Sequence, residues 1–259
     1  MAKLISESRA VLGSLTPLIE LTTTGTDDWP AWDRFLAING SAVVHIGNIC
    51  GTCSFFFERL DDAARPPIDV MRAELAKGLV EIDPLVFDSF GALLPKGDYL
   101  LALIECTPVR VEQGAGDDYF VADKQDAYDD PMEPNTHYYR LKDRSSIDLG
   151  KDQYDDPVLG FEFIVPLAQS IDETTVSVYR ASLITGGCPT AVSLSVLDIK
   201  QPYDGQAHWC MAHYLLDGHH KVEAAAQAAE PITVLAFIPL DGGISREEHI
   251  SAFLSSYPQ

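Results

Sequence analysis

Residues 214–226, which read Tyr-Leu-Leu-Asp-Gly-His-His-Lys-Val-Glu-Ala-Ala-Ala, decide the fold of this chain. The apolar residues before Asp217 predict a strand, the Asp217-Gly218 pair predicts a tight turn, and the alanines after Lys221 predict a helix. The first N–H groups of such a helix have no acceptor within it, and the helix dipole adds positive potential at the same place. A phosphate or another anion is therefore the natural ligand of this turn.

Composition limits the classes of protein to which the chain can belong. Its 259 residues are 46% hydrophobic, which is typical of a folded chain of one large or two modest domains. The 39 acidic and 18 basic residues leave a net charge of −21, which disfavours nucleic acid and an anionic membrane as partners. No apolar run approaches the length of a membrane span, and residues 1–7 lack the apolar core of a signal peptide. We therefore expect a cytoplasmic protein without a membrane segment, and the five cysteines predict no disulfide framework.

Strand and helix patterns outside this turn predict an α+β fold, a mixed β-sheet with flanking helices. A short polar segment, called the polar lead, precedes the first predicted strand. Ser245 and Glu248 form the spacing of a capping box for a last helix that ends near Tyr257. Strands are predicted over 17–23, 41–46, 99–105, 109–112, 160–167, 175–184, 190–199, 207–216 and 232–238, and helices over 27–36, 66–79 and 220–229.

The segment 114–157 differs from the rest in being acidic and rich in aspartate and tyrosine. Its aspartate pairs lack the spacing and the closing glutamate of a calcium loop, so we expect a solvated surface excursion that a protein partner could contact. Within it, residues 137–141 predict an edge strand. The chain is divided on this basis into an α+β region, 1–185, and a phosphate-binding segment, 186–259, that packs with it in one compact unit.

The run Leu216 to Lys221, with the helix that follows and the strand from Ile232, resembles the ParB/sulfiredoxin superfamily. In that superfamily a strand ends in an Asp-Gly-His-His-Arg type of turn, and the next helix supports the phosphates of a bound nucleotide. The segment from Pro189 to Pro202 resembles the strand that runs beside this motif. The resemblance covers Pro189 to Gln259 and implies a nucleotide with magnesium as the cofactor.

The resemblance also assigns roles to the residues of the turn. Gly218 would allow the close turn, His219 and His220 would face the phosphates, and Lys221 would stand at the arginine position, where it offers a point charge instead of a bidentate fork. Sulfiredoxins have a catalytic cysteine where this chain has His219, so that chemistry is not expected. The candidate catalytic residues are Asp217, His219 and His220, and the carboxylates that could hold magnesium are Asp198, Asp204 and Asp217.

The pair Cys50 and Cys53, in the run Cys-Gly-Thr-Cys, has three interpretations. It could be half of a structural zinc site, a thioredoxin-like redox pair, or two small residues that pack beside Phe55 to Phe57. A zinc site needs two more ligands, for which the candidates are Cys188, Cys210, His45, His208 and His213.

These patterns favour a protein that binds a nucleotide or another phosphate-bearing small molecule, with a phosphotransferase or a nucleotide hydrolase as the candidate enzyme. Two alternatives stay open. In one, the chain is a non-enzymatic regulatory protein, stabilised by zinc at Cys50 and Cys53, whose Asp-Gly turn is scaffold only. In the other, it is a thiol-disulfide redox protein. The sequence shows no Walker-type loop, no Gly-x-Ser-x-Gly elbow and no His-Glu-x-x-His motif.

Overall fold

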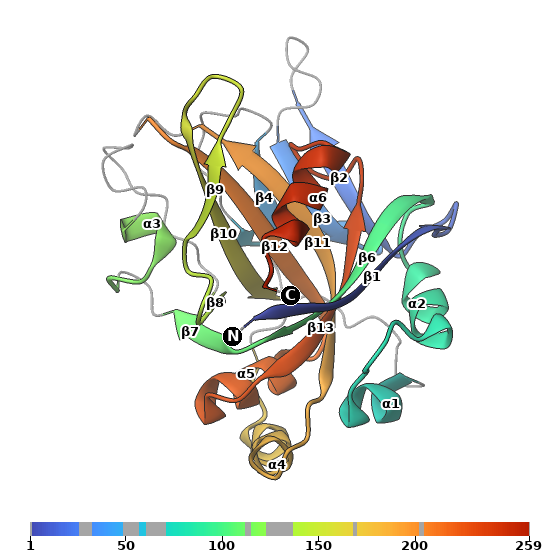
Figure 1. Cartoon of the computed structure of the whole chain (residues 1–259). Helices are drawn as coiled ribbons and strands as arrows, with labels where there is room; N and C mark the ends of the chain where they lie inside the picture. Colours follow the sequence, from blue (N-terminus) through green and yellow to red (C-terminus); the bar gives the residue numbers. More distant parts are fainter. Residues whose placement is uncertain are drawn as a thin grey trace.

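Two β-sheets form the body of the protein in this computed structural model, which describes residues 2–25, 33–48, 57–60, 71–111, 115–122, 137–167, 170–201 and 205–258 (Figure 1). The large sheet has the order β1 (Lys3–Leu12), β6 (Gly97–Cys106), β13 (Ile232–Pro239), β11 (Thr190–Lys200), β12 (Ala207–Asp217), β10 (Pro157–Pro166), β8 (Tyr138–Leu141) and β7 (Pro108–Val111), and β9 (Ile147–Lys151) also pairs with β10. The small sheet contains β2 (Ile19–Thr24), β3 (Asp33–Ile38), β4 (Ser41–Asn48) and β5 (Glu58–Arg59). The helices are α1 (Arg72–Lys77), α2 (Pro84–Gly91), α3 (Tyr119–Ala122), α4 (Glu173–Ile184), α5 (His219–Ala228) and α6 (Glu247–Ser255).

The large sheet mixes parallel and antiparallel pairs, which agrees with the predicted α+β class. Its strands β11, β12 and β13, all from residues 186–259, lie between β6 and β10, which come from residues 1–185. The two parts of the chain therefore share one sheet. None of the helices in the described ranges is long and apolar enough to cross a membrane.

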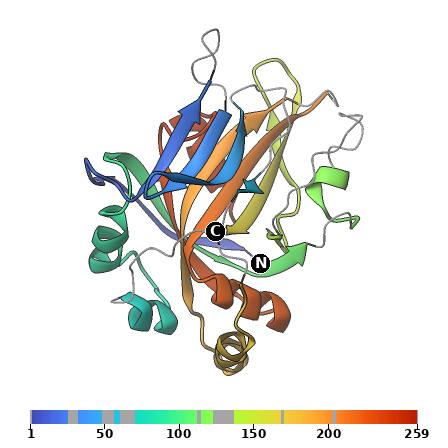
Figure 2. The ribbon, with the colours of Figure 1, turned by 180° about the vertical axis from the view of Figure 1, so that it is seen from behind.

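Both faces of the large sheet are covered, which explains why its central strands are apolar at consecutive positions. Side chains on a strand alternate between faces. On β12, Tyr214 and Leu216 belong to the core shared with the small sheet, α1 and α2, whereas Met211 and Leu215 belong to the core shared with α4, α5 and α6. Seen from behind, the small sheet lies across the large one (Figure 2).

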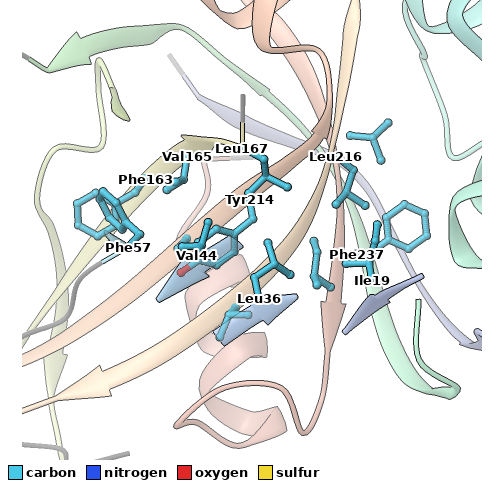
Figure 3. Packing of buried hydrophobic residues seen from close by; sticks show 14 of the residues in the cluster. Ile19, Leu36, Val44, Phe57, Phe163, Val165, Leu167, Tyr214, Leu216 and Phe237 are labelled. Atoms are coloured by element: carbon cyan, nitrogen blue, oxygen red, sulfur yellow. The ribbon is translucent and has the colours of Figure 1, made fainter. Parts of the chain in front are cut away.

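The core between the two sheets is aromatic and aliphatic (Figure 3). Leu36 and Val44 of the small sheet are fully buried and lie toward Tyr214 and Leu216 of β12. The ring of Phe57 is tilted by 54° against that of Phe163 of β10, with 5.6 Å between their centroids. Burial of one such side chain contributes about 1.5–3 kcal/mol to stability. This core therefore covers one face of the large sheet with the small sheet, α1 and α2.

The end of α6 packs on the same face of the large sheet as α4 and α5. Tyr257, which follows α6, is buried and donates a hydrogen bond to Glu162 of β10. The C-terminal end of α6 therefore covers a buried polar residue in the middle of the sheet.

Two crossover connections place the starts of α4 and α5 at the carboxyl ends of neighbouring strands. Strands β10 and β12 are parallel neighbours, so their carboxyl ends lie side by side. Helix α4 follows β10 and leads into β11, and α5 follows β12 and leads into β13. The two helices pack together, and Arg180 of α4 donates to Gln227 of α5. In Figure 1 they lie together below the sheet.

The strand predicted over 175–184 is wrong, because this segment is helix α4. The carboxylate of Asp172 accepts hydrogen bonds from the N–H groups of Thr174 and Thr175 and caps the helix. Val176 and Leu183, seven residues apart, then bury the same face. A cap and tertiary packing thus outweigh the strand preference of the threonines and valines.

Other elements also differ from the prediction. Of the helix predicted over 66–79, the described part forms α1 only over Arg72–Lys77, and helix α2 was not predicted. Residues 33–36 belong to strand β3 instead of a helix, because their pairing with β2 and β4 buries alternate side chains, and the rest of that predicted helix lies outside the described residues. The polar lead is strand β1, whose polarity suits an edge. Residues 138–141 form β8, which pairs with both β7 and β10 and is not an edge. Helix α6 is capped at Arg246 instead of Ser245, and the Arg246 N–H donates to His249 Nδ1 at 3.1 Å.

Candidate functional site

The turn between β12 and α5 has the predicted strand, turn and helix. Gly218 has a φ of 102° and is the N-cap of α5, so the helix begins at His219. A Cβ atom at position 218 would lie 2.7 Å from the Ala191 Cβ, and both constraints favour glycine. As N-cap residue, Gly218 offers no side chain to the first N–H groups of α5.

Lys221 anchors this turn from inside. Its side chain is 2% exposed, and Nζ donates to the Thr190 carbonyl at 2.8 Å and to Asp217 Oδ2 at 2.6 Å. Burial lowers the pKa of the lysine amino group, and the nearby Asp217 carboxylate opposes this shift. The ammonium group of Lys221 therefore points into the protein in this conformation, and its expected role as a phosphate ligand stays a prediction.

The two histidines lie at the start of α5, where it meets α4. Their rings are 4.0 Å apart between centroids. The backbone N–H of Asp172 donates to His220 Nε2 at 2.9 Å, so His220 joins the N-cap residue of α4 to the first turn of α5. His220 thus has a structural contact that its sequence position did not predict.

Positive charge gathers around this turn, although the chain as a whole is strongly acidic. The guanidinium group of Arg72, on α1, is close enough to help lower the pKa values of Lys221 and Tyr179. Tyr179 lies on α4, where burial and the charge of Asp217 raise its pKa. Of these two cations, Lys221 pairs with the negative charge of Asp217, and Arg72 adds positive charge near the same turn.

Of the three carboxylates expected for magnesium, only Asp217 lies at the turn within the described ranges. Asp198 is buried at the other end of β11, where its Oδ1 accepts bonds from Arg34 Nη1 at 3.0 Å and the Ile244 N–H at 2.8 Å. Eight residues of extended strand, about 26 Å, separate it from Thr190, whose carbonyl accepts from Lys221. Asp204 lies outside the described residues.

Two of the four cysteines proposed for zinc, Cys188 and Cys210, lie far apart. Cys188 precedes β11 and its thiol lies 3.8 Å from the Pro231 carbonyl, whereas Cys210 pairs in register with Asp198 at the far end of the same strand. These two cysteines cannot share one metal ion. Cys50 and Cys53 lie outside the described residues. In the ranges that are described, no three His, Cys, Asp or Glu side chains are grouped in a way that could hold a metal ion.

A second polar cluster, which the sequence did not suggest, crosses three neighbouring strands under α6. We call its members Ser195, His213 and Glu162 the buried relay. His213 Nε2 lies 3.0 Å from Glu162 Oε1, and Nδ1 lies 2.8 Å from Ser195 Oγ. An ionised carboxylate only accepts, so Nε2 carries the proton shared with Glu162 and, in the neutral ring, Nδ1 accepts from the serine hydroxyl. The order of serine, histidine and carboxylate is that of a hydrolase triad.

Burial argues against a nucleophile at Ser195. Its side chain is fully buried, as is Ser193, whose hydroxyl lies 3.0 Å from Ser195 Oγ. The other end of the buried relay is closed as well, because Arg144 Nε donates to Glu162 at 2.7 Å and also binds Ser256. A substrate has no path to the hydroxyl in this conformation. The arrangement is a satisfied polar core.

Charge balance keeps Glu162 ionised. Burial alone raises the pKa of this carboxyl, but the His213 hydrogen bond and the Arg144 charge outweigh burial and hold the pKa below its ordinary value. The sequence carries a weak signal for this cluster: glutamate, serine and histidine each stand within an apolar strand. Buried polar residues of this kind need partners. The chain positions do not say which strands are neighbours.

Comparison with known proteins assigns no family to this site. No family model, no curated protein and no solved structure matches the chain. The likeness of Leu216 to Lys221 to the ParB/sulfiredoxin turn therefore stays a prediction that rests on these residues.

Proposed function

We propose that this protein binds the phosphate group of a small molecule, a nucleotide being the expected class, at the start of α5. The observation that carries the proposal is the adjacent start of α4 and α5 at the carboxyl ends of the parallel strands β10 and β12. Ligands of open α/β sheets bind at such carboxyl ends, and helix N-termini attract phosphate.

The two helix starts differ in what already occupies them. At α4 the carboxylate of Asp172 accepts from Thr174 and Thr175, so a protein anion stands where a phosphate would bind. The Thr175 hydroxyl also donates to Asp172, and this bond has the largest effect in lowering the pKa of the Asp172 carboxyl, followed by the bonds from the two N–H groups. At α5 the N-cap is Gly218, which has no such group. The start of α5 is therefore the position that favours an external anion.

In this proposal the backbone N–H groups of the first turn of α5 and the imidazoles of His219 and His220 contact the phosphate. Lys221 acts indirectly, because its bonds to Asp217 and the Thr190 carbonyl hold the turn in shape and offset the charge of the aspartate. Asp217, which precedes the turn, is the candidate ligand for magnesium. A phosphotransfer or hydrolysis reaction would use the same atoms, with the protein supplying position and charge.

The first test is calorimetric titration of the whole chain with ATP, ADP, CTP, GTP and inorganic phosphate, with and without magnesium. The decisive variant is His219→Glu. A carboxylate in the first turn favours the helix by about 0.3–1 kcal/mol, whereas it repels a phosphate at the same place. We expect at least a tenfold loss of affinity with no loss of thermal stability.

His249→Glu is the matched control. It makes the same change of charge in the first turn of another helix, α6. We expect it to leave nucleotide affinity within twofold of the wild type. Absence of binding by all five ligands, or an equal loss in both variants, would contradict a site at α5.

A further inference from the structure

The two terminal strands of the large sheet are not equivalent. At one end β7 has four residues, begins at Pro108, and carries Arg110, which lies 3.2 Å from Glu223 of α5. At the other end β1 has ten residues, and within the described ranges β6 is the strand that pairs with it (Figure 1). Such an edge presents a row of backbone N–H and C=O groups that another strand can pair with. Edge β1 is therefore the long open side of the sheet.

The centre of β1 is exposed and carries both signs of charge. Glu7, Ser8 and Arg9 are exposed, and Val11 is 70% exposed. Glu7 and Arg9 are in register with Ala102 and Leu100 of β6 and point to the side of α6, where Arg9 Nη1 lies 2.7 Å from Glu247. Strand β1 itself thus presents one anion and one cation, two residues apart, on its helix side, and Arg9 Nε also lies 3.6 Å from Asp98 of β6.

The sequence of β1 is complementary to itself in one antiparallel register. We propose that the outer edge of β1 binds β1 of a second copy of this chain about a twofold axis through Ser8. Glu7 of each copy then lies opposite Arg9 of the other, and Ser6 lies opposite Ala10. Directly opposed residues in antiparallel strands share a face and interact, and opposite charges there are favourable. The two-fold axis uses the same edge on both copies, which is the commonest form of homodimer.

The neighbouring registers lack this match. An axis through Glu7 opposes two glutamates, and an axis through Arg9 opposes two arginines. An axis through Ser6 places Lys3 opposite Arg9. Like charges directly opposed are destabilising, so the charge pattern selects Ser8 as the centre.

The length of the ladder is limited on one side by a bulge. The register with β6 shifts between Leu4 and Ser6, so regular pairing with β6 extends from Ser6 to Leu12, and about an axis through Ser8 the regular part of the new ladder is Ser6 to Ala10. The exposed Val11 would lie near Ile5 of the second copy. A strand pair of this length buries less surface than a permanent interface, so the dimer is expected to be reversible and to weaken as salt rises.

Sedimentation velocity on the whole chain, over a range of protein and salt concentrations, tests the proposal. The wild type should dimerise with increasing concentration. Glu7→Arg and Arg9→Glu should each weaken the dimer at least tenfold, and the double variant should recover it because the opposed charges are exchanged. Circular dichroism and thermal melting confirm that each variant folds. Arg9→Glu also loses internal bonds, so Glu247→Gln, which should keep the dimer, is its control.

Cysteine cross-linking gives an independent reading that needs no change of charge. Ser8→Cys places the two new thiols opposite each other, close enough for a disulfide under mild oxidation. Ala10→Cys, on the same face, would oppose Ser6 and should not cross-link above the wild-type background. A wild type that stays monomeric at every concentration would overturn the proposal. So would a dimer insensitive to both charge variants, or equal cross-linking of the two cysteine variants.

Discussion

The turn at the start of α5 and the buried relay under α6 both contain a histidine and a carboxylate, but they differ in what surrounds them. In the buried relay Ser195, His213 and Glu162 are at most 2% exposed, and hydrogen bonds join each of them to the next. In the turn the buried part is Lys221, while Asp217 and the two histidines lie at least partly exposed at the carboxyl end of the sheet.

This difference shows that a serine, histidine and carboxylate joined by hydrogen bonds are a poor guide to catalysis when a substrate cannot reach the serine. The buried relay has the serine, histidine and carboxylate order of a hydrolase, yet its polar atoms satisfy each other within the core. The turn has no such order, but it brings two helix starts together, and the N-cap residue of α5, Gly218, has no side chain to accept from the first N–H groups. Exposure and the lack of a capping side chain at α5 therefore support the proposal of a ligand site at the turn.

The largest effect should come from breaking the buried relay. Glu162→Ala leaves Arg144 and His213 buried without their carboxylate, and removal of one partner of a buried ion pair costs about 3–5 kcal/mol. Urea unfolding, followed by circular dichroism, measures the loss. Glu81→Ala, at an exposed position, should change stability by about 0.5 kcal/mol or less. A loss no larger than this control would show that the buried relay does not hold α6 in place.

A smaller effect is expected at the turn. Lys221→Met keeps the buried volume but leaves the Thr190 carbonyl and Asp217 without a donor, which costs about 1–3 kcal/mol. Water can reach Asp217, whose side chain is 16% exposed, so the loss should be less than at Glu162. Lys77→Met, on an exposed lysine paired with Glu74, is the control and should cost at most about 0.5 kcal/mol.

The stability and the binding of the Lys221 variant separate its two roles. If Lys221 is an anchor that holds the turn, the variant protein loses stability first. Its ligand affinity then falls only in proportion to the disorder of the turn. A direct phosphate ligand would lose affinity with stability unchanged. The second result would support the role that the resemblance assigned to Lys221.

The sequence predicted the turn well because its signals are local. An apolar run, Asp217-Gly218 and an alanine-rich segment each report on the next few residues, and the strand, turn and helix follow in that order. The inward direction of Lys221 was not predictable, because it depends on the Thr190 carbonyl, which is brought beside the turn by β11. Helix α4 was missed because its cap and its buried face outweigh strand propensity.

The buried relay could not be assembled from the sequence for a similar reason. Glu162, Ser195 and His213 stand on strands that are neighbours only after the crossovers through α4 and α5 have set the order β11, β12, β10. The order of strands is a property of long-range packing. A polar residue inside an apolar strand predicts that a partner exists, and the three-dimensional fold identifies the partner.

A change of pH should have the smallest effect on the unfolding free energy near neutrality. It should also distinguish the buried relay from the turn at the start of α5 most sharply. Glu162 has a folded pKa below its ordinary value of 4.5, so it contributes stability that is complete above that value and is lost as the pH falls through the lower folded pKa. The change in unfolding free energy between about pH 8 and pH 6 should therefore owe nothing to Glu162, and the unfolding free energy should fall below about pH 4.5. Glu162→Gln, which does not titrate, should flatten this acid slope. The variant should keep the part of the acid slope that is due to Glu223, whose pKa is lowered by hydrogen bonds from Tyr139 and Gln227 in spite of its burial.

An unchanged acid slope in Glu162→Gln would mean that Arg144 and His213 do not hold the Glu162 carboxylate ionised. The contrast between a satisfied polar core and an exposed turn would then lose its electrostatic basis.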